Sequence, residues 1–278
     1  MRVDGRRVRG LNGMYELIPQ FLPHRFDAMN MITLDIPAEP LRLYMNEKRR
    51  EGHHISHLAL IIAAYLRTAA EFPMLNRFVG NKKLYAHKDF TVSMVVLRPG
   101  EDEDTMSKIY LEYPDDIFEV QRKITEYISE NRKDDNANPL DKVVKVLRNI
   151  PGILNIVGAA LRFMDRHGIL PKALIKASPF HASLLISNLA SIRTNHIYHH
   201  VYEFGTTSIA ITMGNSREIP HRRKGEIVLE KCIPLGVVMD ERICSGHYFA
   251  QAFSRLKTYL ADPTLLEGPP KFEIKEDR

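Results

Sequence analysis

The chain has little cysteine and no long apolar run, and both features limit the classes of protein to which it can belong. Only two of its 278 residues are cysteines, Cys232 and Cys244, which is too few for a disulfide framework and suits a reducing cytoplasm. The most apolar stretches, 58–66 and 153–161, are far shorter than the roughly 20 residues of a membrane-spanning helix. The N-terminus lacks the apolar run of a signal peptide. We therefore expect a cytoplasmic protein without a transmembrane segment.

The chain also lacks a glycine-rich phosphate-binding loop, and aromatic residues are not interleaved with its basic ones. Its formal net charge is +5 and its pI is about 9.1, with basic residues gathered at 2–9, 48–50 and 222–224. Without aromatic stacking platforms we expect no nucleic acid partner. Two interpretations of the basic patches stay open, a solvated surface and the attraction of a phosphate-bearing anion.

The apolar pattern predicts helices and strands in irregular alternation, which is typical of an α/β sandwich with a mixed sheet. The clearest helix has Ser56 as its N-cap and ends before Pro73. The predicted helices span 38–50, 55–72, 117–131, 140–150, 153–167 and 246–260. The predicted strands span 30–36, 83–86, 90–97, 184–189, 208–213, 226–233 and 236–239. The first 13 residues are expected to form an arm or an edge extension.

Three short segments carry a family resemblance. The segment Asp240-Glu-Arg-Ile-Cys-Ser-Gly246 is similar to the signature Asp-His-Arg-x-x-Asp-Gly of the dihydrolipoamide acyltransferase catalytic core of 2-oxoacid dehydrogenase complexes. Chloramphenicol acetyltransferase has the related His-x-x-x-Asp-Gly. Leu185-Ile-Ser-Asn-Leu189 resembles the family strand Thr-Ile-Ser-Asn-Leu-Gly, and Glu71-Phe-Pro-Met-Leu-Asn76 resembles its helix end His-Pro-x-Leu-Asn. These segments occur in the family's order across about residues 20–266, so the chain resembles the chloramphenicol acetyltransferase-like superfamily.

The resemblance implies a two-layer α/β sandwich with a mixed β-sheet covered by helices, in a single domain over residues 1–278. It implies a homotrimer, because the active sites of the family form between neighbouring subunits. It also implies no tightly bound cofactor and a coenzyme A thioester as substrate. Residues 134–179 have no close equivalent in the dihydrolipoamide core, and we expect a helical insertion, an added hairpin. This apolar hairpin either packs on the core, forms a wall for a long acyl chain, or docks a protein partner or a membrane.

The chain differs from the family at two positions of the catalytic motif. The family's catalytic histidine falls on Glu241, and the motif aspartate, which pairs with an arginine near the first strand, falls on Ser245. Arg25 is a plausible counterpart of that arginine. With Ser245 in place of the aspartate, Glu241 is the carboxylate that could capture Arg25, and this ion pair would make it a weaker base.

In the family the histidine takes the proton from a thiol or hydroxyl acceptor, and a strand hydroxyl donates to the oxyanion of the tetrahedral intermediate. Ser187 matches that hydroxyl, and its alternative role is a hydrogen bond to neighbouring backbone. A glutamate with an ordinary pKa of about 4.3 is a weak base toward a thiol, although burial can raise the pKa of a carboxyl group by several units. Glu241 is therefore either an altered general base or part of a site that has lost its chemistry.

Other histidines could replace the missing base, and two groups of them suggest metal at first sight. His199 and His200 precede the strand at 208–213 in a region that lines the substrate channel of the family, and His181 and His247 are weaker candidates. We expect no metal at 53–57 or 196–200, because neither histidine group has the acidic or cysteine companions of a metal motif. Cys244 is interpreted as a packing residue.

Two functions follow from these residues. The first is an acyl-CoA-dependent acyltransferase acting on a thiol or hydroxyl acceptor with Ser187, Glu241 and one of His199 or His200. The second is a pseudoenzyme, a trimeric scaffold or ligand-binding protein that retains the acyltransferase fold and uses the apolar hairpin for contacts. Fold alone does not choose between them.

Overall fold

The computed structural model describes residues 2–97, 104–131, 152–223, 225–274 and 277. Its helices are α1 (Gly13–Phe21), α2 (Ala38–Arg50), α3 (His57–Glu71), α4 (Ile117–Asn131), α6 (Ile153–His167), α7 (Lys172–Ala177) and α8 (Gly246–Ala261). Its strands are β1 (Gly5–Arg7), β2 (Met29–Pro37), β3 (Arg77–Gly80), β4 (Lys83–His87), β5 (Phe90–Leu97), β6 (Asp104–Leu111), β7 (Leu184–Asn188), β8 (Ile209–Met213), β9 (Arg217–Arg223) and β10 (Glu226–Asp240). Short 3-10 turns lie at Phe26–Ala28, Pro73–Asn76, Leu189–Ile192 and Pro263–Leu266.

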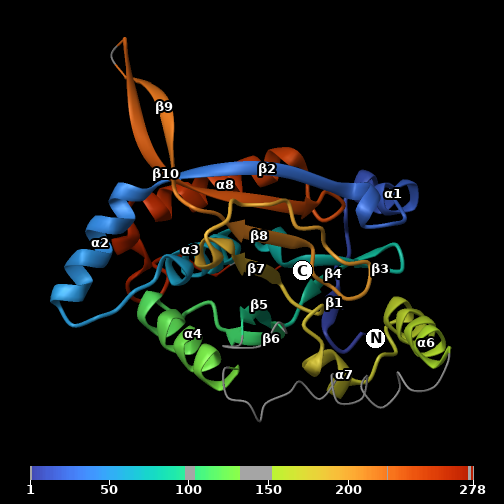
Figure 1. The fold of residues 1–278 in the computed structure, drawn as a ribbon. Coiled ribbons are helices and arrows are strands. Elements are labelled where there is room, and N and C mark those ends of the chain that lie inside the picture. The colour runs from blue at the N-terminus through green and yellow to red at the C-terminus, as the bar shows by residue number, and fades with distance from the viewer. Residues whose placement is uncertain (1, 98–103, 132–151, 224, 275–276, 278) are drawn as a thin grey trace.

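A mixed seven-stranded sheet forms the centre of the molecule (Figure 1). Its strand order is β2-β10-β8-β7-β5-β6, and β9 pairs with the outer half of β10. The β5–β7 and β7–β8 pairs are parallel and the others are antiparallel. β1, β4 and β3 form a second, small sheet, in which β1 is an edge strand. The predicted mixed sheet is thus confirmed, and the N-terminal arm is an edge extension.

The main core lies between one face of the sheet and the helices around α3. Every residue from Ala59 to Ala70 is buried, and α3 packs against both α4 and α8. The hydroxyl of Ser56 accepts a hydrogen bond from the Ala59 amide at 3.1 Å, which confirms the predicted N-cap. Since the helix is apolar on nearly all sides, burial on all sides is the arrangement its sequence favours. No helix in the described ranges is long and apolar enough to cross a membrane.

Strand β10 corrects the sequence prediction of two strands at 226–233 and 236–239. One continuous strand runs from Glu226 to Asp240 through Pro234. β9 pairs with β10 as far as Cys232, and β8 begins to pair with it at Leu235. The proline, which has no amide hydrogen to donate, therefore lies between the two ladders. β3, β6, β9, α1 and α7 were not predicted, and the expected loop 134–139 and helix 140–150 lie outside the described residues.

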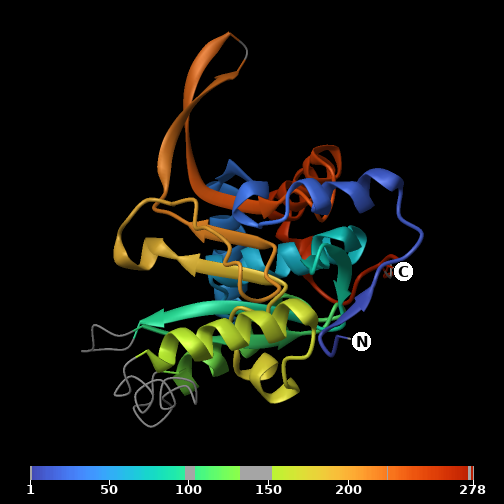
Figure 2. The ribbon, with the colours of Figure 1, turned by 90° about the vertical axis from the view of Figure 1, so that its right-hand side faces the viewer.

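β9 and the first half of β10 leave the body of the protein as a two-stranded hairpin, which Figures 1 and 2 show from two sides. Ile227 and Leu229 on this hairpin are 76% and 62% exposed. From Cys232 onward β10 is buried, because β8 and β2 flank it on both edges. A single strand thus connects the projecting hairpin to the centre of the sheet.

Helix α6, in the predicted insertion, is held to the body by polar contacts. Asp165 is its one buried residue, whereas Ile156 and Phe163 are exposed. The Asp165 carboxylate pairs with Arg2 at 2.7 Å and accepts a hydrogen bond from the Gly205 amide at 2.8 Å. α6 therefore lies beside the N-terminal segment in both views (Figures 1 and 2). Arg2, one of the basic residues gathered at 2–9, is buried in this network, so the interpretation as a solvated surface does not hold for it.

A loop crosses the sheet face opposite the helices, and two glycines make room for it. A β-carbon at Gly214 would lie 2.2 Å from the His196 nitrogen, and one at Gly236 would lie 2.3 Å from the Ile197 carbonyl oxygen. The amide of Ile197 donates to the Thr212 hydroxyl at 3.1 Å. The loop backbone thus lies directly on β8 and β10, which any larger residue at these glycines would prevent.

Replacing Gly236 with alanine should therefore displace the crossing loop, because the new methyl group would overlap the Ile197 carbonyl. We expect Gly236→Ala to lower the free energy of unfolding by about 1–3 kcal/mol, as overpacking does. Urea denaturation measures this loss. The control is Gly158→Ala on α6, where the added methyl group would meet only Arg162 at 3.7 Å. An equal loss in both variants would contradict the close contact at Gly236.

Candidate functional site

A buried ion network holds the end of β10. The Asp240 carboxylate, which is completely buried, receives two hydrogen bonds from the Arg242 guanidinium, at 2.8 and 2.7 Å. It also lies 3.5 Å from the Arg25 guanidinium. Arg25 donates to the carbonyl oxygens of Tyr202 and Gly205, and burial lowers its pKa while Asp240 opposes that shift. Two arginines and one carboxylate thus fasten the strand end to the segments around it.

Glu241, the next residue, lies outside this network. Its carboxylate accepts a hydrogen bond from the Asn30 side chain at 2.7 Å, and its amide donates to the Ala28 carbonyl at 2.9 Å. Among the described residues, no lysine or arginine forms an ion pair with it. The expected alternative in which Glu241 captures Arg25 is wrong, because Asp240 is the carboxylate that contacts Arg25.

Ser187 lies near the end of β7, half buried, on the sheet face opposite the helix core. It is in register with Thr212 on β8. Its hydroxyl makes no hydrogen bond to any described residue, so the predicted alternative of a serine bonded to neighbouring backbone is not what the structure has. The side-chain oxygen of its neighbour Asn188 is buried without a hydrogen-bond partner. The end of β7 therefore carries two polar atoms without a hydrogen-bond partner among the described residues, the partly exposed Ser187 hydroxyl and the buried Asn188 oxygen.

Glu241 and Ser187 are far apart within one chain. Thr212, which pairs with Ser187, also pairs with Gly236 on β10, and Glu241 comes five residues after Gly236. Five residues of strand extend about 17 Å and two strand spacings add about 10 Å sideways, so the two α-carbons are about 19 Å apart. This separation exceeds what two side chains can bridge. One copy of the chain therefore does not bring them together.

Comparisons with known proteins agree with the architecture. A family model described as 2-oxoacid dehydrogenases acyltransferase (catalytic domain) matches residues 181–267. A probable dihydrolipoamide acetyltransferase from Listeria monocytogenes 4b F2365 matches with a TM-score of 0.59 and 14% identity, over 97% of this chain and 99% of that one. The Azotobacter vinelandii dihydrolipoamide acetyltransferase matches with a TM-score of 0.61 and 14% identity, over 91% of this chain and 88% of that one. A chloramphenicol acetyltransferase matches with a TM-score of 0.55 and 12% identity, over 92% of this chain and 99% of that one.

The chain has the chloramphenicol acetyltransferase-like fold. No curated protein sequence matches it. The family match covers two of the three segments that carry the resemblance in the sequence, 185–189 and 240–246, and the third, 71–76, lies outside it. Within this fold, Glu241 directly follows the last residue of β10.

The loop that crosses this face brings His196 over the row of residues that contains Ser187. The ring nitrogen Nε2 of His196 lies 3.1 Å from the Thr33 hydroxyl, and its Nδ1 atom is buried without a partner. Burial lowers its pKa, and Arg217 adds to that shift. Sequence reasoning missed His196 as a candidate base. The signal available was glycine at 214 and 236, which in strands indicates close approach of another backbone.

His199 and His200, the predicted substitutes for the base, stack on each other at 5.0 Å, and the His199 ring donates to the His200 carbonyl. Neither makes a contact with Ser187 or Glu241. His181 is buried against Asp165 at 3.2 Å, which makes it a structural residue, and His247 is exposed on α8.

The histidine groups considered for metal do not assemble in the described residues. His57 begins α3 whereas His53 precedes it and packs on Phe118, and the segment 196–200 is not helical. The interpretation of Cys244 as a packing residue is confirmed, since it is completely buried in the core. Burial also raises the pKa of its thiol, which disfavours the nucleophilic thiolate.

A basic cavity of about 710 Å³ adjoins the strand end. Arg25 and Arg242 line it from the β10 side, and Lys82, Arg162 and Arg166 line it from the other side. Six lysine or arginine residues and two carboxylates surround the cavity, so its charge favours an anion. A second cavity, of about 1000 Å³, lies beside the N-terminal arm and is away from the β10 end.

Single substitutions of Asp240, the structural carboxylate, and of Glu241, the candidate base, test this geometry directly. Asp240→Asn should lower the free energy of unfolding by about 3–5 kcal/mol, because it leaves two buried arginines without their charge partner. Glu241→Gln should change stability little, since Glu241 is partly exposed and bonds a neutral amide. Urea denaturation of both variants measures the difference. Comparable losses would mean that the two carboxylates share one network.

Proposed function

We propose that this chain transfers an acyl group from an acyl-CoA to a thiol or hydroxyl acceptor, with Glu241 as general base. The observation that supports this is the freedom of the Glu241 carboxylate from the arginines beside it. Asp240 contacts both Arg25 and Arg242, so neither guanidinium is paired with Glu241. Glu241, held by the Asn30 amide, keeps an oxygen that can accept a proton.

Each group has one role in the reaction. Glu241 takes the proton of the acceptor, whose sulfur or oxygen attacks the thioester carbonyl. The hydroxyl of Ser187 donates to the oxyanion of the resulting tetrahedral intermediate. The intermediate then expels the coenzyme A thiolate, which takes the proton back from Glu241. Protons and charge balance over the cycle, and the base is restored.

The site is completed by oligomerisation, as a homotrimer in which Glu241 of one subunit faces Ser187 of the next. The separation of about 19 Å within a chain requires a second copy. One similar structure is the cubic core of a pyruvate dehydrogenase multienzyme complex, matched at a TM-score of 0.61 and 14% identity. In the Azotobacter vinelandii enzyme, a serine, a histidine and an asparagine four positions later were investigated for their catalytic roles. Glu241 and Ser245 have the same spacing as that histidine and asparagine.

Loss of either residue should depress acyl transfer. We expect Glu241→Gln to lower the rate by roughly 10²- to 10⁴-fold, as loss of a general base does, and Ser187→Ala by roughly 10²- to 10³-fold. The assay follows release of coenzyme A from acetyl-CoA and a long-chain acyl-CoA with a panel of thiol and hydroxyl acceptors.

Mixed oligomers of the two variants should regain activity at about a quarter of their sites. An active site then needs a subunit with intact Glu241 followed by a subunit with intact Ser187.

The alternatives give different results in this assay. If Glu241→Gln keeps the full rate and His196→Gln loses it, the base is His196 above the Ser187 row. If the mixed oligomers stay inactive while each parent folds, the shared site is wrong. If the wild-type protein neither turns over nor gains thermal stability with any acyl-CoA, the trimeric scaffold or ligand-binding protein is favoured.

The basic cavity is where the phosphates of coenzyme A are expected to bind. Lys82→Ala combined with Arg166→Ala should raise the KM for acyl-CoA and leave kcat unchanged, because these cations lie on the side of the cavity away from Glu241. Steady-state kinetics at two salt concentrations measure the effect, which should shrink as salt screens the phosphates. The matched control is Lys257→Ala, an exposed lysine on α8. A KM that changes equally in the control would place the phosphates elsewhere.

A further inference from the structure

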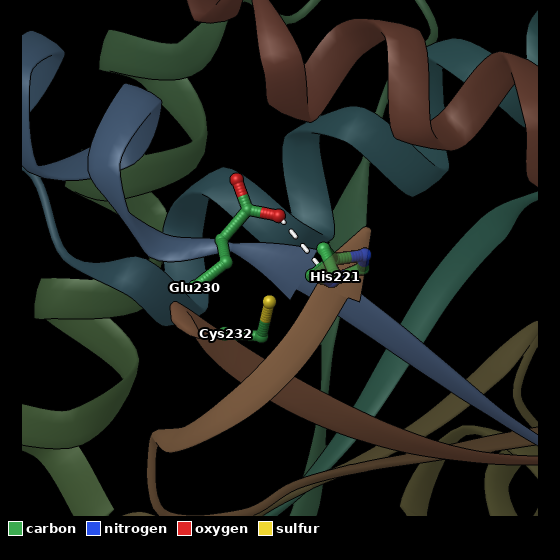
Figure 3. Close-up of side chains that lie close together, drawn as sticks. All are labelled: His221, Glu230 and Cys232. Carbon is green, nitrogen blue, oxygen red and sulfur yellow. Dashed lines mark ion pairs between the residues drawn. The ribbon is translucent and has the colours of Figure 1, made fainter. Parts of the chain in front are cut away.

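Three side chains of metal-binding type meet where the hairpin leaves the sheet. His221 comes from β9, and Glu230 and Cys232 come from β10. One ligand atom of each residue lies within 4.8 Å of those of the other two, and Figure 3 shows the side chains close together on the hairpin. The His221 Nε2 atom is 3.3 Å from the Glu230 carboxylate. No other group of this kind occurs in the part of the chain that the structure describes.

The strand register explains why these side chains converge. His221 pairs with Val228, and Glu230 and Cys232 follow Val228 at two-residue steps on β10. Side chains two residues apart on a strand point to the same face, so all three lie on one face of the hairpin. The backbone therefore places them together without a loop rearrangement.

The spacing fits a tetrahedral metal ion. With zinc–nitrogen and zinc–oxygen bonds of about 2.1 Å and a zinc–sulfur bond of about 2.3 Å, ligand atoms are about 3.4–3.6 Å apart. The His221–Glu230 contact already has this separation. The thiol lies within 4.8 Å of the other two ligand atoms, so a shift of about 1 Å brings it to bonding distance of a shared ion. His221 is 44% exposed, so an ion can enter from its side.

The charges around the cluster also favour a divalent cation. Glu230 and a Cys232 thiolate supply two negative charges. Arg217, which lies opposite Cys232, is paired with Asp35 at 3.0 Å, so its positive charge is offset. Thiolate and imidazole ligands select zinc over magnesium and calcium, which prefer oxygen.

We propose that His221, Glu230 and Cys232 form a zinc site that fixes β9 to β10 at the root of the projecting hairpin. The three side chains leave one of four tetrahedral positions for water or a ligand from another molecule. The bound ion replaces the proton of the Cys232 thiol, because cysteine binds zinc as the thiolate.

Cobalt(II) substitution tests the site directly, because tetrahedral cobalt with a thiolate ligand absorbs in the near ultraviolet and the visible. Wild-type protein should bind one Co²⁺ per chain with both absorptions, and Zn²⁺ should displace it. Cys232→Ser should abolish the thiolate band, and zinc binding should weaken by more than the roughly 10- to 100-fold that loss of an outer-shell partner costs. His221→Gln should weaken binding without removing the band.

Two variants serve as matched controls. Cys244→Ala removes the other cysteine, and Glu226→Gln removes a carboxylate from the same hairpin outside the cluster. Both should keep the wild-type stoichiometry and spectrum. A thiolate band that persists in Cys232→Ser, or folded wild-type protein that binds no zinc at micromolar concentrations and neutral pH, would overturn the proposal. Because metal binding is measured without substrate, this result is independent of acyl transfer.

Discussion

The arrangement of the candidate site depends on one buried carboxylate, Asp240, held between Arg25 and Arg242. A charge without access to water is tolerated only when partners and hydrogen bonds replace its hydration. Here the partners come from distant parts of the chain. Arg25 precedes β2 and also bonds the carbonyls of Tyr202 and Gly205, and Arg242 bonds the carbonyl of Leu22. The last residue of β10 thus fixes the N-terminal region and the loop before β8 at once.

This network has a consequence for the residue that follows. Because Arg25 and Arg242 both contact Asp240, Glu241 follows the same strand end without being paired to a cation. The resemblance in the sequence implies that the family's histidine and aspartate are exchanged, which by itself suggests a loss of two functional groups. In the structure, the salt bridge between strand and arginine is present with Asp240 as the acid, and the adjacent carboxylate remains chemically accessible.

Strand β10 has three parts with different structural roles. Its outer half carries the projecting hairpin and the His221, Glu230 and Cys232 cluster, its middle is buried between β2 and β8, and its end carries Asp240 and Glu241. The separation of Ser187 from Glu241 is set by the same strand, since its register is fixed over nine residues by β2.

The sequence by itself determined the elements whose apolar pattern is strong. The 3.6-residue pattern and Ser56 located α3, alternation located β2, and the motif order indicated the acyltransferase fold. Tertiary structure alone decided that β10 passes through Pro234, that Arg25 pairs with Asp240 and not with Glu241, and that His196 lies over the row of Ser187. It also decided that His221, Glu230 and Cys232 meet. The reason is physical: local patterns report which face of an element is buried, whereas register and loop paths depend on strands distant in sequence that only the folded sheet brings together.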